Sequence, residues 1–135
     1  MRVELPLETP ITLFVRIVGE KTTRELRAVL DTGSMYSLIP REDAVQLGYT
    51  TLYDPLQPQL GGEGALTVTG SYIIEVPVVT LKEVRLGGLK AENVKAVVWD
   101  LPEPSGADVL LGINFLKNFK TTLDYKKGTL TIEEI

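Results

Sequence analysis

Residues 28–40 read AVLDTGSMYSLIP, and this stretch governs how the rest of the chain is interpreted. The apolar residues before Asp31 predict the end of a buried strand, and the polar motif from Asp31 to Ser34 follows as a turn. A carboxylate at the end of a buried strand is costly unless a partner or a function uses it. An Asp-Thr-Gly triplet arises by chance in about 3% of chains of this length, so the motif needs support from other segments.

Periodicity along the rest of the chain predicts short strands and brief helices. Apolar and polar residues alternate over 11–17, as in a half-buried strand, and a turn at 19–21 leads into the apolar stretch that ends at Asp31. Pro40 and Gly48 are typical of the two ends of a short helix. Further elements are expected as strands within 66–79, 84–86 and 94–99, a loop at 102–106, a helix after Gly112, and a closing hairpin of 121–124 and 129–132. The sequence therefore predicts one mostly β domain over residues 1–135.

Composition excludes several classes of chemistry. The chain has 135 residues, 44% of them hydrophobic, with no cysteine, no histidine and a net charge of −4. Thiolate or imidazole metal sites, cysteine nucleophiles, Ser/His/Asp triads and disulfides are therefore excluded, and we expect neither a metal nor a cofactor. The acidic balance argues against nucleic acid as a partner. No apolar run approaches the 18 residues of a membrane span, so we expect a soluble cytoplasmic protein with no membrane partner.

Two later segments bear on the same question. Residues 108–116 read DVLLGINFL and place Leu110, Leu111 and Gly112 directly before a predicted helix. Residues 60–65 read LGGEGA and lie between the Asp-Thr-Gly motif and that segment. Three glycines between strand-like arms predict the mobile tip of a hairpin.

Taken together, the three segments resemble the retroviral-like (retropepsin-type) aspartic proteases, and the pattern is closest to the retrotransposon and prokaryotic single-domain members. Order and spacing agree, and the resemblance covers Ile11 to Ile132. It implies a retropepsin-like closed β-barrel lobe with one or two short helices and a flap hairpin, assembled as a homodimer. The chain departs from the viral pattern at Ser34, where viral enzymes usually have Ala, and at Ile113, where they usually have Arg.

The resemblance also implies a role for each motif residue. Asp31 would be catalytic, and Thr32 would join the active-site loops of the two subunits through hydrogen bonds across the dimer axis. Gly33 would permit the tight turn and offer its N–H to the carboxylates, while Ser34 would donate to an outer carboxylate oxygen. Leu110, Leu111 and Gly112 would form the scaffold behind this loop. The flap would contain Leu60, Gly61, Gly62, Glu63, Gly64 and Ala65.

The expected chemistry requires a second chain. Aspartic peptide hydrolysis needs two carboxylates that share one proton, and no other aspartate here precedes Thr or Ser and then Gly. A symmetric homodimer would place Asp31 of each subunit at the two-fold axis. The sequence thus predicts an aspartic endopeptidase that hydrolyses extended peptide or protein substrates. The alternative is a non-catalytic dimerisation or peptide-binding module of the same fold, and a monomeric carboxylate hydrolase of another substrate is less well supported.

Overall fold

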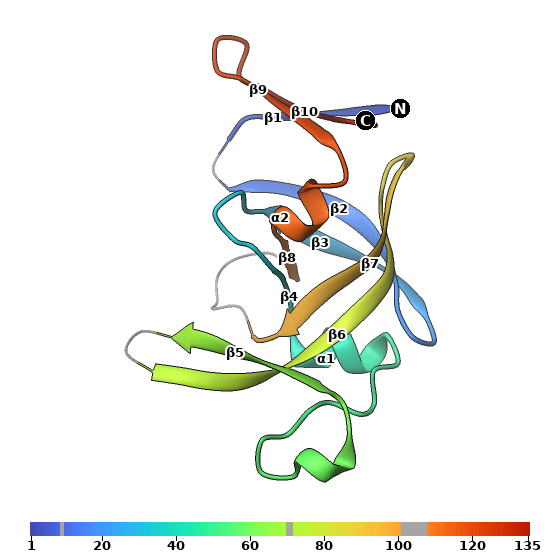
Figure 1. Cartoon of the computed structure of the whole chain (residues 1–135). Coiled ribbons are helices and arrows are strands. Elements are labelled where there is room, and N and C mark those ends of the chain that lie inside the picture. Colours follow the sequence, from blue (N-terminus) through green and yellow to red (C-terminus); the bar gives the residue numbers. More distant parts are fainter. Residues whose placement is uncertain (9, 70–71, 101–107) are drawn as a thin grey trace.

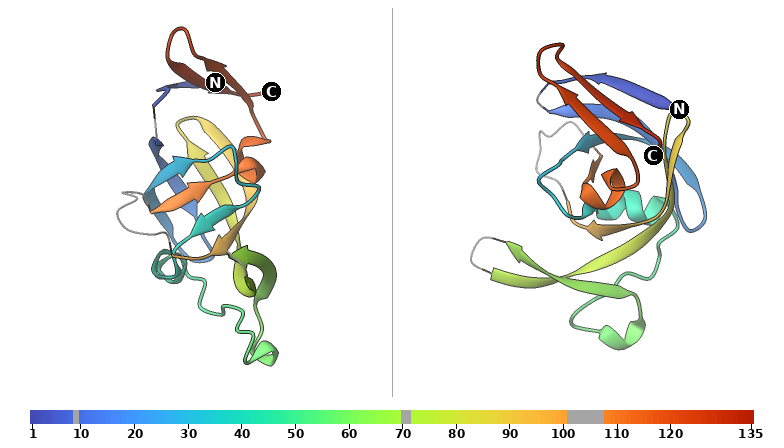
Figure 2. Two further views of the ribbon diagram at one scale, coloured as in Figure 1. Left: turned by 90° about the vertical axis from the view of Figure 1, so that its left-hand side faces the viewer. Right: turned by 45° about the horizontal axis from the view of Figure 1, so that its top comes forward.

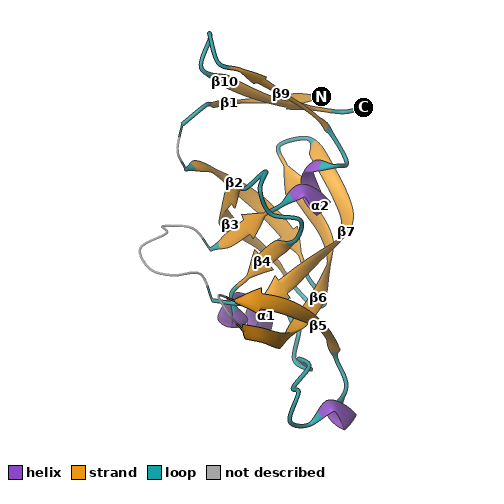
Figure 3. Ribbon diagram, turned by 60° about the vertical axis from the view of Figure 1, so that its left-hand side comes forward, coloured by secondary structure: helices purple, strands orange, loops and turns teal. Residues whose placement is uncertain are grey.

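The computed structural model describes residues 1–8, 10–69, 72–100 and 108–135, although the side chains of 66–69 are not described. Strands dominate the described part of the chain, and its helices are short (Figures 1 and 3). The elements are β1 (Arg2–Pro6), β2 (Ile11–Val18), β3 (Thr23–Leu30), β4 (Ser37–Ile39), α1 (Arg41–Gln46), a 3-10 helix η1 (Pro58–Leu60), β5 (Glu63–Thr69), β6 (Tyr72–Leu86), β7 (Leu89–Val98), β8 (Val109–Leu111), α2 (Ile113–Leu116), β9 (Lys120–Asp124) and β10 (Thr129–Glu133).

Six strands close into a barrel. Hydrogen bonding follows the order β2-β3-β8-β4-β7-β6, and a further β2–β6 pairing joins the two ends of this series. Most neighbours are antiparallel, but β8 runs parallel to β3, and β4 runs parallel to β7. Closure leaves none of these six strands as a free sheet edge. The predicted mostly β, closed-barrel fold with two short helices is therefore confirmed.

Alternate side chains of the strands point into the barrel and form its core. Along β2, Leu13, Val15 and Ile17 are buried and the residues between them are exposed, as the period-two pattern of the sequence predicts. Helix α1 begins directly after Pro40 and carries Glu42 in its first turn, where a negative charge favours the helix dipole. Gly48 follows the helix with a φ of +99°, a left-handed conformation that favours glycine.

A second, smaller sheet lies over one end of the barrel. Its order is β1-β10-β9, with all pairs antiparallel (Figure 2, right). The closing hairpin of β9 and β10 was predicted, but β1 was not recognised as a strand. Its signal is the alternation of Val3 and Leu5 with charged residues, and its partner β10 lies at the far end of the chain.

The hairpin of β5 and β6 extends away from the barrel. Strand β6 is a single strand of 15 residues whose second half belongs to the barrel and whose first half pairs with β5 outside it (Figure 1). The hydroxyl of Tyr49, which follows α1, donates to the Thr80 carbonyl of β6 over 2.5 Å. The loop predicted at 102–106 lies outside the described residues. No helix within the described ranges is long and apolar enough to cross a membrane.

Candidate active site

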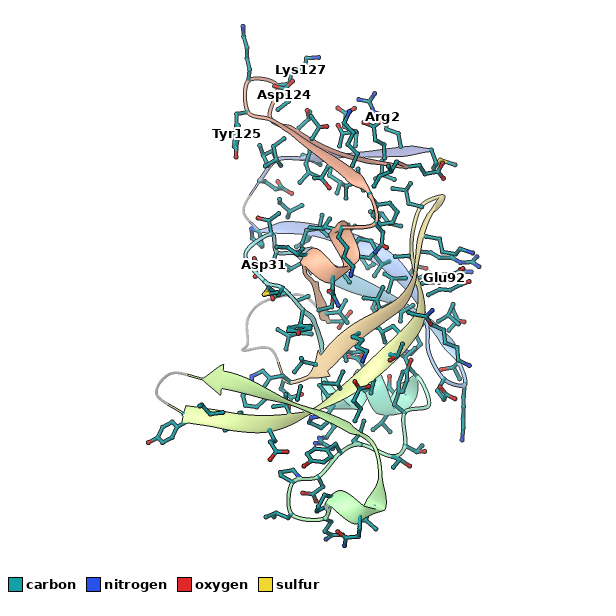
Figure 4. The ribbon with its side chains drawn as sticks, in the orientation of Figure 1. Arg2, Asp31, Glu92, Asp124, Tyr125 and Lys127 are labelled. Carbon is teal, nitrogen blue, oxygen red and sulfur yellow. The ribbon has the colours of Figure 1, made fainter. Side chains whose placement is uncertain are left out.

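Asp31 emerges where β3 ends, at one side of the barrel (Figure 4). Its backbone N–H donates to the Leu111 carbonyl of β8 over 2.9 Å, so the parallel pairing of β3 with β8 fixes where the chain turns. The Asp31 side chain is half-buried. Strand β3 is thus followed by an aspartate whose backbone is hydrogen-bonded to β8 and which is still partly exposed to solvent.

The segment after Asp31 crosses directly over Gly112. A Cβ atom at Gly112 would lie 2.5 Å from the Tyr36 carbonyl oxygen and 2.6 Å from the Ser34 carbonyl oxygen. The first backbone N–H groups of the following helix bind the same segment, because Ile113 donates to the Ser34 carbonyl over 2.7 Å and Asn114 donates to the Met35 carbonyl over 3.1 Å. Only glycine fits at this crossing. The close contact is the physical basis of the scaffold role expected for the Leu-Leu-Gly motif.

A hydrogen-bonded pair, the buried Ser37 and the half-buried Asn114, reinforces the crossing and was missed by sequence reasoning. Ser37 is 1% exposed, and its Oγ accepts the Gly112 N–H and donates to Asn114 Oδ1. The Asn114 amide nitrogen donates in turn to the Lys95 carbonyl of β7 over 2.6 Å. The available signal was a serine within a short apolar strand, since a buried hydroxyl requires a partner.

Two roles assigned within the motif can be compared with the geometry. The Gly33 N–H donates to Asp31 Oδ1 over 2.8 Å, as expected. The Ser34 hydroxyl instead donates to the Tyr36 carbonyl over 2.8 Å, so the prediction that it donates to the Asp31 carboxylate is wrong. The carbonyl is only two residues away and the turn brings it within reach. Thr32 is exposed, and its expected role across a dimer axis stays a prediction.

Half-buried aliphatic side chains form a row beside Asp31. Five neighbouring strands each place one residue in register with the next, on the outer face of the barrel. The members of this aliphatic row are Val29, Leu110, Leu38, Val97 and Val78. Val29 precedes Asp31 by two residues, so strand alternation directs both side chains to the same face. A carboxylate beside a continuous apolar strip is suited to an extended chain with apolar side chains.

Comparison with known proteins gives the family. The family model for aspartyl proteases matches residues 15–115. The chain belongs to the aspartyl protease family. The fold is similar to the crystal structure of a retropepsin-like aspartic protease from Rickettsia conorii, with a TM-score of 0.69, 20% sequence identity, and coverage of 98% of this chain and 89% of that one. No curated protein matches the sequence significantly. Family and fold together support a protease-type function.

In this aspartyl protease fold, the β5–β6 hairpin corresponds to the expected flap, but the glycines do not lie at its tip. Residues Leu60 to Gly62 precede β5, and Glu63, Gly64 and Ala65 begin it. The hairpin register ends far from them, where Thr69 faces Tyr72. The prediction of a glycine-rich flap tip at 60–65 is therefore wrong, because these glycines form the base of the hairpin.

Tyr53 explains why the base is rich in glycine. Gly62 has a φ of +87°, and a Cβ there would lie 2.5 Å from the Tyr53 backbone nitrogen. The Tyr53 ring packs against Gly64, and its hydroxyl donates to Glu75 of β6, which raises the pKa of Tyr53. At the start of β5, Glu63 forms an ion pair of 2.6 Å with Lys95 of β7. The β5 arm is thus joined to β7 at the base of the hairpin, and the β6 arm is joined to the loop that contains Tyr53.

Each of the other five aspartates of this family member has a structural partner. Asp43 pairs with Arg24 over 3.0 Å, and burial raises the pKa of its carboxyl. Each of the remaining four carboxylates accepts a backbone N–H. The donor is Leu56 for Asp54, Arg41 for Asp100, Arg27 for Asp108 and Lys127 for Asp124. Within the described ranges no group of three or more Asp, Glu, His or Cys side chains could hold a metal ion. None of the partners of these five aspartates is Asp31 or a residue of its turn.

Substitution of Gly62 tests the packing at the flap base. Gly62→Ala should lower the free energy of unfolding by about 2–4 kcal/mol, because it combines an unfavourable φ with the overlap on Tyr53. Gly128 is the matched control, since its φ is +66° and nothing lies within 4 Å of a Cβ placed there. Gly128→Ala should therefore lose only the backbone contribution, about 1–2 kcal/mol. Equal losses in urea unfolding would contradict the proposed packing of Tyr53 on Gly62.

Proposed function

We propose that this protein is an aspartic endopeptidase in which Asp31 and the partner subunit's Asp31 form the catalytic dyad of a homodimer. The observation that carries the proposal is the placement of Asp31. It is half-buried, receives the Gly33 N–H, and shares a face with the aliphatic row. Residues 1–135 would act as one domain.

The chemistry follows from two carboxylates that share one proton. The ionised carboxylate takes a proton from a water molecule, whose oxygen attacks the peptide carbonyl carbon, while the protonated carboxylate gives its proton to the carbonyl oxygen. When the tetrahedral intermediate collapses, the C–N bond breaks and a proton moves to the leaving nitrogen. The Gly33 N–H donates to Asp31 Oδ1 and so helps to hold the carboxylate in one orientation.

Substrate binding would use the aliphatic row and the flap. An extended peptide lying beside Asp31 would place alternate side chains against the row, and the β5–β6 hairpin projects on the same side of the barrel as Asp31 (Figure 4). We therefore expect cleavage next to aliphatic or aromatic residues. Neither a metal nor a cofactor has a role in this mechanism.

Replacing Asp31 tests the proposal directly. Asp31→Asn should lower the rate of peptide-library cleavage about a thousandfold or more, because the shared acid and base are removed while the shape of the side chain is kept. Asp54→Asn is the matched control, because among the described residues the Asp54 carboxylate accepts the Leu56 N–H alone, and this variant should retain full activity. Turnover that persists in a folded Asp31→Asn protein would contradict the catalytic assignment. An inactive wild type that binds peptides would favour the non-catalytic module.

Ser34 gives a prediction about the pH profile of activity. Because its hydroxyl donates to the Tyr36 carbonyl, Ser34→Ala should leave the pH profile of activity in place and cost about 0.5–1.5 kcal/mol of stability. Ser37→Ala should cost more stability, about 1–3 kcal/mol, since it leaves a buried N–H without an acceptor. A shift of the Ser34→Ala profile towards neutral pH would show that the hydroxyl turns to the Asp31 carboxylate in the active dimer.

A further inference from the structure

A polar cavity of about 390 Å³ lies beside the aliphatic row. It is enclosed by the segment that follows Asp31, by α2 with the two residues after it, and by β7. It shares no lining residue with the aliphatic row or with the turn from Asp31 to Ser34. The side chains that matter for its chemistry are Tyr36, Glu92, Asn93, Lys95, Lys117 and Asn118.

Strand register places the polar cavity next to the row. Leu38 and Val97 are neighbours in the row, because β4 and β7 run parallel with these two residues in register. Lys95 precedes Val97 by two residues, so strand alternation directs both side chains to the same face of β7. Tyr36, which is 56% exposed, precedes Leu38 by the same two residues. Two residues of strand span about 7 Å, so a peptide on the row could reach the cavity with its next few residues.

The charge left without a partner in the polar cavity is positive. Glu92 forms an ion pair of 3.1 Å with Lys90, and Lys95 forms its ion pair with Glu63. Lys117 is exposed and forms no ion pair within the described part of the chain. An ammonium group has three N–H donors, so Lys95 can also bind a second acceptor. Two ammonium groups at one cavity favour a carboxylate as the ligand.

The backbone of Asn93 is a second observation at the polar cavity. Among the described residues other than glycine, Asn93 alone has a positive φ, of 54°. Asn93 and Glu92 are both exposed between the buried Ala91 and Val94, so the alternation of β7 is interrupted here. Asparagine tolerates this conformation better than most residues, and its amide can donate to a carboxylate. An unusual backbone conformation inside a strand is typical of functional sites.

We propose that the polar cavity binds an acidic side chain of the peptide substrate, a few residues away from the scissile bond. This inference rests on the proposed function, since the peptide reaches the cavity from the aliphatic row. Lys117 is the residue that determines this specificity, because its ammonium group is not already paired. The preferred substrates therefore combine apolar residues at the cleavage point with Asp or Glu further along the chain. The preference should fade as the salt concentration rises.

Peptides with charged tails test the site. A peptide that the wild type cleaves is extended at one end by a short run of Glu, Gln or Lys residues, and kcat and KM are measured for each tail. Because the proposed dimer is symmetric, either end of the peptide meets one of two such cavities. The Glu tail should lower KM about fivefold relative to the Gln tail. The value of kcat should stay the same, since the tail is bound equally in the ground state and the transition state.

Variants of Lys117 assign the preference to the polar cavity. Lys117→Gln should remove the preference for the Glu tail, and Lys117→Glu should reverse it in favour of the Lys tail. A protein that is merely damaged would lose affinity for all tails and would show no reversal. Lys126→Glu is the matched control, because it makes the same charge change in the turn between β9 and β10, and it should keep the wild-type preference.

The outcomes separate this inference from the proposed function. Equal KM values for the Glu and Gln tails would overturn the acidic site and leave the peptidase proposal standing. A preference for the Glu tail that persists in Lys117→Glu would also overturn the site. Fluorescence anisotropy with labelled tailed peptides measures binding without turnover. A wild type that binds the Glu tail more tightly but cleaves no peptide would support the site and contradict the peptidase, and one that neither cleaves nor discriminates would overturn both.

Discussion

The crossing of the 34–36 segment over Gly112 is the constraint on which the site depends. Strand β8 lies between β3 and β4, so the chain that joins β3 to β4 must pass over the end of β8. It does so close enough that no side chain fits at Gly112, and the N–H groups of Ile113 and Asn114 bind the crossing segment. The position of Asp31 is therefore set by tertiary contacts between segments that are about 80 residues apart in the sequence.

In the proposed function, one chain contributes half of the catalytic centre. Asp31 is the aspartate at the crossing, and the ion-pair and hydrogen-bond partners of the other five lie outside its turn. The Asp31 loop, the flap and the terminal hairpin all face the same side of the barrel (Figure 4). A two-fold axis on that side would bring two Asp31 carboxylates together and would align the terminal sheets of two subunits.

Local patterns predicted much of this arrangement, and the failures have physical causes. The strand that ends at Asp31, the helix between Pro40 and Gly48, and the closing hairpin each have signals within a few residues. Strand β1 was missed because its partner β10 lies more than 120 residues away. The glycines at 61–64 were interpreted as a turn, whereas close packing of Tyr53 and a positive φ require them. The sequence alone does not decide which acceptor the Ser34 hydroxyl binds, because the choice of the Tyr36 carbonyl depends on the folded shape of the loop.

The central claim is that one active site needs an Asp31 from each of two chains. Its most direct test mixes wild-type protein with Asp31→Asn protein at constant total concentration, allows subunits to exchange, and measures initial cleavage rates. If both carboxylates of a dimer are required, activity will fall as the square of the wild-type fraction, so an equal mixture will retain about a quarter of full activity. A linear fall, with about half of the activity left in the equal mixture, would show that each chain works alone and would contradict this account.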